Sequence, residues 1–128
     1  MTEPTYIAVI VREHDKKGPM VFKLTDDLDR MQKLIGCDCI DIPRRFIGDT
    51  EFRIIVDDSG LLKERAPTAY GENPPLVGTI IFTNYTEAGE NFRDLTEEEI
   101  AVIEDNLGQN TDTGDIVVLN VKMRPDSM

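Results

Sequence analysis

The sequence has little of what enzymes and membrane proteins commonly need. Its 128 residues include no tryptophan, one histidine and two cysteines. They contain no apolar run long enough to span a bilayer and no glycine-rich phosphate-binding motif of the P-loop or Rossmann kind. With no serine or cysteine set beside a plausible base, nucleophilic catalysis has no visible machinery. We therefore expect no catalytic residue, no cofactor and no membrane-bound form.

The few residues that bind metals in other proteins are poorly placed here. Cys37 and Cys39 are only two residues apart, which is a poor spacing for a disulfide on a strand, and zinc would need two further soft ligands. His14 lies in a charged turn between Glu13 and Asp15. A lone histidine in such a turn is more often solvated than catalytic. We expect two reduced thiols and no metal site.

Positive charge is scarce, and the net charge is −11. Between residues 87 and 105 there are eight acids and a single base, Arg93. This balance repels phosphate backbones, so direct nucleic-acid binding is not expected. A local acidic surface either attracts a basic partner or keeps the protein soluble. The predicted partner-binding residues are Glu87, Glu90, Asp94, Glu97, Glu98 and Glu104.

A second set of charged residues supports an alternative function. Five bases lie between residues 44 and 65, where acids largely balance them. Guanidinium and ammonium groups bind phosphates well, so these residues could form a site for a nucleotide or another small phosphate-bearing ligand. The candidate residues are Arg44, Arg45, Arg53, Lys63 and Arg65.

Length and hydrophobic pattern predict a single α+β domain over residues 1–128, with residues 122–128 as a tail. Apolar or alternating runs indicate strands at 6–11, 20–24, 37–42, 51–56, 77–82 and 116–121. The first two should form a hairpin, with the first strand at the centre of the sheet. Two helices and these strands predict one mixed or antiparallel sheet of about five to seven strands, with both helices packed on it.

The two helices have clear boundary signals. The first should be capped by Thr25 and end at Gly36, with Leu28 on its apolar face. The second follows Thr96, which with Glu99 forms a capping box.

The apolar stripe and the end of the second helix also follow from the pattern. Ile100, Ile103 and Leu107 lie at helical spacing and should face the sheet, and Gly108 should close the helix. Two other glycines are informative. We expect Gly60 to end a turn at positive φ and Gly78 to mark a close approach or a bulge.

Several of these segments together resemble a known family. Met31-Gln32-Lys33-Leu34-Ile35-Gly36 and Asp58-Ser59-Gly60-Leu61-Leu62 are followed by the strand from Gly78 to Phe82 and by Phe92-Arg93-Asp94-Leu95-Thr96-Glu97. Over residues 20–107 this order is similar to that of a family of small bacterial and phage proteins, domain of unknown function 3846. The resemblance implies a cytoplasmic protein of bacterial, plasmid or phage origin. It implies no activity.

From these observations we predict a non-catalytic accessory protein that binds a basic host macromolecule through its acidic surface. A sharper version is a DNA-mimicking protein that blocks a restriction or defence system by competing for a DNA-binding cleft. The alternative is the small-ligand binder with the arginine patch. A homodimer is compatible with either function.

Overall fold

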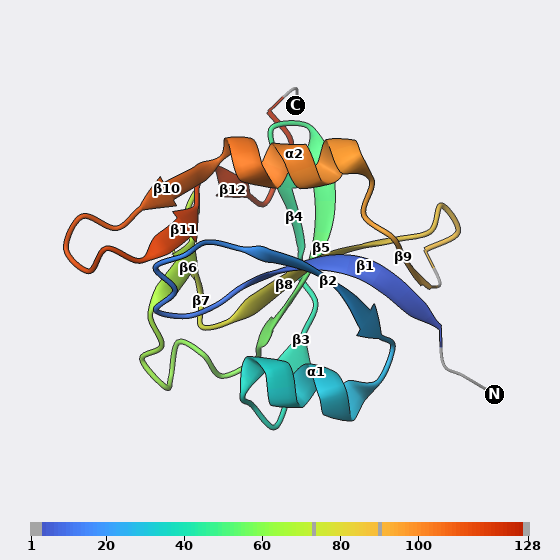
Figure 1. Cartoon of the computed structure of the whole chain (residues 1–128), viewed down its shortest axis with the longest axis horizontal. Helices are drawn as coiled ribbons and strands as arrows, with labels where there is room; N and C mark the ends of the chain where they lie inside the picture. Colours follow the sequence, from blue (N-terminus) through green and yellow to red (C-terminus); the bar gives the residue numbers. More distant parts are fainter. Residues whose placement is uncertain (1–3, 73, 90, 127–128) are drawn as a thin grey trace.

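The computed structural model describes residues 4–72, 74–89 and 91–126. Within these residues two sheets and two helices form the fold (Figure 1). The strands of the larger sheet are β1 (Thr5–Val11), β2 (Met20–Thr25), β3 (Ile40–Asp41), β4 (Arg44–Ile47), β5 (Thr50–Asp57), β8 (Ile80–Tyr85), β9 (Phe92–Arg93) and β12 (Val121–Lys122). Those of the smaller sheet are β6 (Pro67–Ala69), β7 (Leu76–Val77), β10 (Leu107–Gln109) and β11 (Ile116–Val118). The helices are α1 (Leu28–Ile35) and α2 (Glu97–Asp105).

The larger sheet is antiparallel throughout, in the order β12-β4-β5-β8-β1-β2, with β3 added to β5 and β9 to β8. The smaller sheet has the order β10-β11-β6-β7, and its β11–β6 pair is parallel. The predicted hairpin of the first two strands is confirmed, and β1 lies inside the sheet between β2 and β8.

The central strands are buried on both faces. In β5, Ile54 and the adjacent Ile55 are both fully buried but belong to different core clusters. The same holds for Ile81 and Phe82 in β8. Successive side chains of a strand point to opposite faces, so each face of the sheet carries its own core. This explains why these strands are nearly continuous apolar runs in the sequence.

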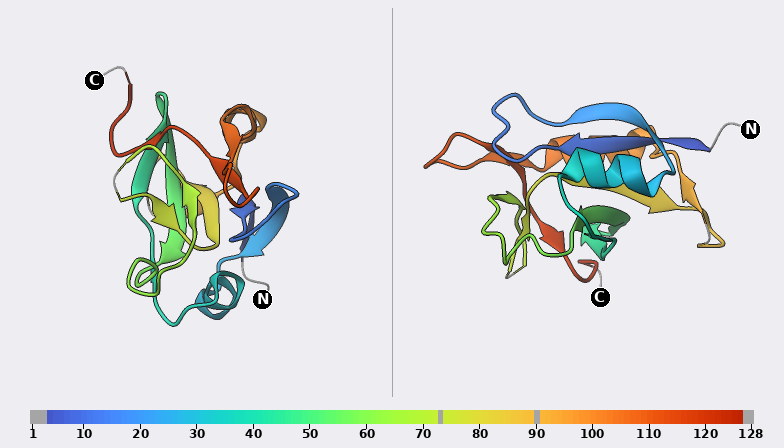
Figure 2. Two further views of the ribbon diagram at one scale, coloured as in Figure 1. Left: turned by 90° about the vertical axis from the view of Figure 1, so that its left-hand side faces the viewer. Right: turned by 90° about the horizontal axis from the view of Figure 1, so that it is seen from below.

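Different elements cover the two faces. The helix α1 buries Met31 and Ile35 on one face. On the other face, α2 buries Ile103 while the smaller sheet contributes Val118. Figures 1 and 2 show the two helices on opposite sides of the larger sheet.

The predicted α+β class is confirmed, with two helices and mainly antiparallel sheets. The prediction of one sheet of five to seven strands is wrong. The larger sheet has eight strands, and a second sheet has four. Two predicted strands are each split in two, and four short strands, β4, β6, β9 and β10, were not predicted. Gly78 has a φ of 77° and separates β7 from β8, and Asn120 has a φ of 63° and separates β11 from β12. In both cases the chain passes from one sheet to the other at the break.

The region expected to be a tail contributes to the larger sheet. Lys122 lies in β12, which pairs with β4. Further along, the Asp126 backbone N–H donates to the carbonyl oxygen of Gly48 at 3.0 Å. The C-terminal part of the described chain is therefore held against the β4–β5 turn.

The start of the first helix differs from the prediction. Its N-cap is Asp27, whose side chain accepts from the backbone of Asp29 at 3.0 Å. Thr25 cannot be the cap because it is the last residue of β2, opposite Thr5. As a result Leu28, expected on the apolar face, is 55% exposed. The predicted end is confirmed, since Gly36 adopts the left-handed conformation.

The start of the second helix is as predicted, but its end is not. Both hydrogen bonds of the capping box at Thr96 are present. The helix stops at Asp105, and Leu107 and Gly108 belong to β10 instead. A side chain at Gly108 would clash with Leu119, because a Cβ there would lie 2.7 Å from the Leu119 Cδ1. This glycine permits close packing rather than closing a helix.

Gly60 and Gly78 are both required for close approach. Contrary to our prediction, Gly60 does not have positive φ. A Cβ at Gly60 would lie 2.8 Å from Val77 Cγ2, and one at Gly78 would lie 2.7 Å from Arg65 Cδ. The two glycines therefore let the loop after β5 pack against β7 and the residues that follow it.

Ile103 should be important for stability, because it is fully buried in the core between α2 and the sheet. We expect Ile103→Ala to lower the free energy of unfolding by about 2–5 kcal/mol. Leu62→Ala is the matched control, since Leu62 is 88% exposed and its truncation should change stability by less than about 0.5 kcal/mol. Urea denaturation of both variants measures the difference, and equal effects would contradict this assignment of the core.

Candidate partner-binding surface

The segment before α2 attaches the helix to the sheet. The Leu95 backbone N–H donates to the Ile7 carbonyl oxygen at 3.0 Å, and the Ile7 N–H donates to the Asp94 carboxylate at 2.8 Å. Leu95 and Ile103 are both buried in the core beneath the helix. These contacts fix the orientation of α2 and thus which of its residues face solvent.

The only base of the acidic segment turns inward. Arg93 forms a two-pronged ion pair with Glu99, with nitrogen–oxygen distances of 2.7 and 2.9 Å. Asn84 Nδ2 donates to the same carboxylate at 2.7 Å, and the Thr96 N–H donates to it at 2.9 Å. Burial raises the pKa of Glu99, but the hydrogen bonds from Arg93, Thr96 and Asn84 outweigh burial and hold the pKa below its usual value. Glu99 is therefore a structural carboxylate that is not available to a partner.

The outer side of α2 carries four exposed acids, which we call the α2 acidic face: Glu97, Glu98, Glu104 and Asp105. At 100° per residue these positions cover an arc of about 120° centred on the exposed Ala101, opposite the buried Ile103. Among the described residues none of the four forms an ion pair. The face is about 12 Å long, from a rise of about 1.5 Å per residue between Glu97 and Asp105. It is a compact group of four uncompensated carboxylates.

The predicted acidic residues do not all belong to this face. Asp94 is exposed, but its carboxylate is bound to the backbone of β1. Glu87 lies on the loop between β8 and β9, beyond the start of α2 (Figure 1). Glu90 lies outside the described residues. Asp105, which was not among the predicted partner-binding residues, joins the face because it lies on the same side of the helix as Glu98, about two turns further along.

The structure does not gather the five predicted basic residues into one patch. At the start of β5, Arg44 Nε pairs with Glu51 at 2.5 Å, and Arg53 lies 3.6 Å from the same carboxylate. The Arg53 guanidinium also stacks on the ring of Tyr85. Arg45 lines a cavity to which neither Arg44 nor Arg53 contributes. These arginines are largely engaged by neighbours within the protein.

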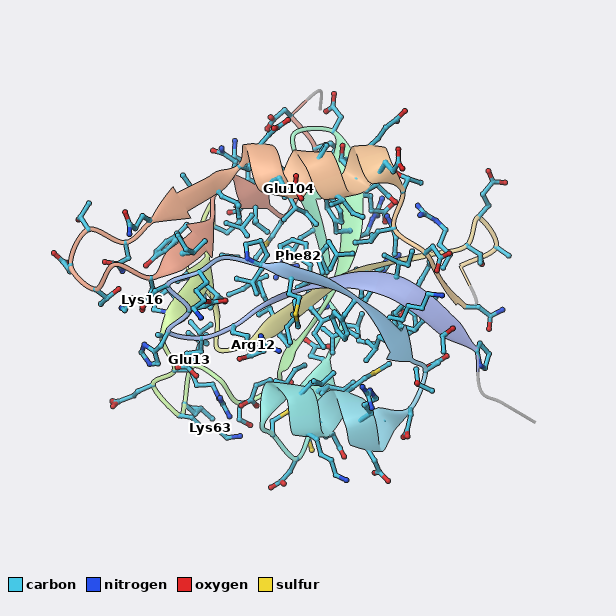
Figure 3. All side chains as sticks on the ribbon, viewed as in Figure 1. Arg12, Glu13, Lys16, Lys63, Phe82 and Glu104 are labelled. Atoms are coloured by element: carbon cyan, nitrogen blue, oxygen red, sulfur yellow. The ribbon has the colours of Figure 1, made fainter. Side chains whose placement is uncertain are left out.

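The other two bases, Lys63 and Arg65, bind the buried carboxylate of Asp57 at the end of β5. Arg65 Nε and Lys63 Nζ bind Asp57 Oδ2 at 2.7 and 3.0 Å, and Arg65 also binds Glu13 at 3.3 Å. Burial raises the pKa of Asp57, but the Ser59 N–H and Lys63 outweigh it and hold the pKa below its usual value. This ionic cluster is separate from the α2 acidic face: in Figure 3, Lys63 and Glu13 lie far from Glu104 of α2.

A cavity of about 360 Å³ lies beside the Arg93–Glu99 ion pair. Arg53 and Arg93 line it together with three acids, Glu51, Glu87 and Glu99. Acids therefore outnumber bases around the cavity, which does not suit a phosphate-bearing ligand.

The two cysteines and the single histidine lie in different parts of the structure. Cys37 and Cys39 are free thiols, and burial raises the pKa of Cys37, which disfavours a reactive thiolate. The exposed His14 lies 3.3 Å from Asp115, which also pairs with Lys16 at 2.7 Å. In the described parts of the chain, no group of three or more histidine, cysteine, aspartate or glutamate side chains is placed to hold a metal ion. Neither of the described helices is both long and apolar enough to cross a membrane.

Comparison with known proteins identifies a family. The model of a family described as Domain of unknown function (DUF3846) matches residues 7–108, which include both helices, the eight strands β2 to β9 and parts of β1 and β10. This confirms the resemblance seen in the sequence and extends it to β1. No curated protein and no solved structure matches the chain.

The Arg93–Glu99 ion pair should control stability at acidic pH. Because the folded-state pKa of Glu99 is lowered, its contribution is fully present above the unfolded pKa of about 4.3 and is lost as the pH falls through the folded pKa. We expect Glu99→Gln to cost about 2–3 kcal/mol at pH 7 and to flatten the loss of stability on acidification.

The control for this prediction is Glu97→Gln, which removes one carboxylate from the exposed side of the same helical turn. Denaturant unfolding of both variants from pH 7 to pH 3 provides the measurement. If the two variants are equally stable at pH 7, the buried ion pair is not the stabilising contact that its geometry indicates.

Proposed function

We propose that this chain, which belongs to the DUF3846 family, is a non-catalytic interaction protein that binds a basic protein surface through the α2 acidic face. The observation that carries this proposal is that the four carboxylates of the face are exposed and uncompensated, whereas Arg93, the nearest base in the sequence, is committed to Glu99. A surface charge that the protein does not neutralise internally is free to meet a charge on a partner.

The size of the face favours a particular kind of partner. Four carboxylates within about 12 Å along the helix match a short row of lysine or arginine side chains on a helix or a loop. The rigid attachment of α2 through its capping box, Leu95 and Ile103 holds the carboxylates in place, so little order has to be gained on binding.

Charges near a helix end also affect stability, and this allows the two roles to be separated. Glu97 and Glu98 lie in the first turn, where negative charge complements the helix dipole. Glu104 and Asp105 lie in the last turn, which has no basic residue, and there negative charge opposes the dipole. Their presence in spite of this electrostatic cost is consistent with a role in binding.

We expect Glu104→Lys/Asp105→Lys to weaken partner binding and, at the same time, to stabilise the helix by about 0.3–1 kcal/mol per residue. A loss of binding in this variant cannot then be attributed to unfolding. The experiment is capture of partners from a bacterial lysate on immobilised wild type and variant, at low and at high salt, together with thermal unfolding of both proteins. Capture should fall with salt, as the Debye length shortens from about 30 Å at 0.01 M to about 3 Å at 1 M.

The matched control is Glu64→Lys/Asp112→Lys, which changes the net charge by the same amount at two exposed positions outside α2. It should retain the partner if the face, rather than total charge, is responsible. A partner that is indifferent to salt and to the α2 variant would contradict the proposal and leave the face as a solubilising surface. Displacement of the captured partner by duplex DNA would further support the DNA-mimicking version.

A further inference from the structure

The strand β2 forms an open edge of the larger sheet. It pairs with β1 on one side, and the order of strands ends there. The right-hand panel of Figure 2 shows β2 at the outer margin of the molecule, with no other segment beyond it. An edge of this kind presents unpaired backbone donors and acceptors to another strand.

The register identifies which groups are open. Ile7 directs its N–H to Asp94 and its carbonyl to Leu95, both on the side of β1 away from β2. The neighbouring residues of β1 must therefore point toward β2, because backbone groups alternate along an antiparallel strand. Ala8 then bonds to Phe22, its partner in the register. It follows that Val21, Lys23 and Thr25 direct their N–H groups outward.

The open edge also carries apolar surface. Met20 and Val21 are 43% and 48% exposed, and Phe22 is half-buried against the α1 side of the core. Edge strands are usually protected by charge, and here Lys23 is the only charged residue within β2. A strand partner would cover this apolar surface and pair the open backbone groups.

We propose that a second copy of this chain is that partner, with two β2 strands pairing antiparallel around Phe22. In this register Val21 lies opposite Lys23 of the second copy, and Phe22 lies opposite its own counterpart. Centring the pair on Lys23 would place two lysines opposite each other, which is unfavourable. Centring it on Val21 would place Lys23 opposite Pro19, which has no N–H to donate.

The backbone groups at the ends of this register also fit. Pro19 lies opposite Thr25 of the second copy, where the Thr25 N–H can donate to the Pro19 carbonyl. Proline can return no hydrogen bond, and none is needed, because the Thr25 carbonyl already accepts from Asp27 at 2.8 Å. The two irregular ends of β2 are therefore complementary to each other.

Two oppositely charged residues beyond the ends of β2 also favour this register. Continuing this register beyond Pro19 places Gly18 of one copy opposite Asp26 of the other, with Lys17 next to it, and the two-fold symmetry brings Lys17 near Asp26 twice. Both residues are exposed, and neither side chain pairs with another charged residue of the described chain. The pairs lie at the β2 edge, on a different element from the α2 acidic face.

Sedimentation equilibrium over a range of concentrations tests the proposal, and the expected mass rises toward twice 14.5 kDa. Val21→Pro should abolish the dimer, because it removes an outward N–H without touching the β1–β2 hydrogen bonds. Val21→Thr, which keeps the N–H and the branched side chain, should dimerise like the wild type. Circular dichroism checks that both variants are folded.

The charged pair provides an independent test that does not alter the strand. Lys17→Glu should weaken dimerisation about tenfold, since the change affects two symmetric pairs, and adding Asp26→Lys should restore it. A wild type that stays monomeric at every concentration would overturn the proposal, as would a dimer unaffected by Val21→Pro or by the charge exchange. If the wild type is monomeric but captures another protein, and Val21→Pro fails to capture that protein, the edge binds a strand of a different protein. That result would likewise overturn the dimer proposal.

Discussion

The need to cover the larger sheet on both faces governs the arrangement of this fold. Because β1, β5 and β8 bury side chains on each side, either face left open would expose a core-sized apolar surface. The described residues form only two helices, and on the α2 side the smaller sheet shares the core with the helix. The smaller sheet completes that layer, so the β6–β7 and β10–β11 segments are needed for the same reason as the helices. The outer side of α2 then faces solvent and carries its four exposed acids.

Patterns that depend on a few neighbouring residues were readable from the sequence. The long apolar strands, the β1–β2 hairpin and the capping box at Thr96 are all determined locally, and all are present. The short strands are different, since two or three residues carry no usable period and are defined by what lies beside them. The split at Asn120 is an example. The pattern of residues 116–121 predicts one strand, but Asn120 has a positive φ, and the residues before and after it belong to different sheets.

The candidate surface was predictable in composition but not in detail. Local charge indicated the acidic segment, and helical spacing could have added Asp105. The engagement of Asp94 by Ile7 could not have been foreseen, because it joins residues 87 positions apart. The basic residues are a similar case. Arg65 looks like a free cation in the sequence, and only the folded chain brings Asp57 and Glu13 to it.

The position of β1 between β2 and β8 has a consequence for the order in which the protein can form during synthesis. The hairpin and α1 are complete once the residues up to Gly36 have left the ribosome, yet the other edge of β1 waits for Phe82 and then for Leu95. Through that interval the nascent chain holds a half-built sheet whose inner edge, with Val9 and Val11, has no partner. Pairing between distant segments is slow, and unpaired apolar strands attract other chains. The growing polypeptide is therefore most vulnerable to misassembly after α1 has emerged, and this vulnerability ends when the residues that lead into α2 emerge.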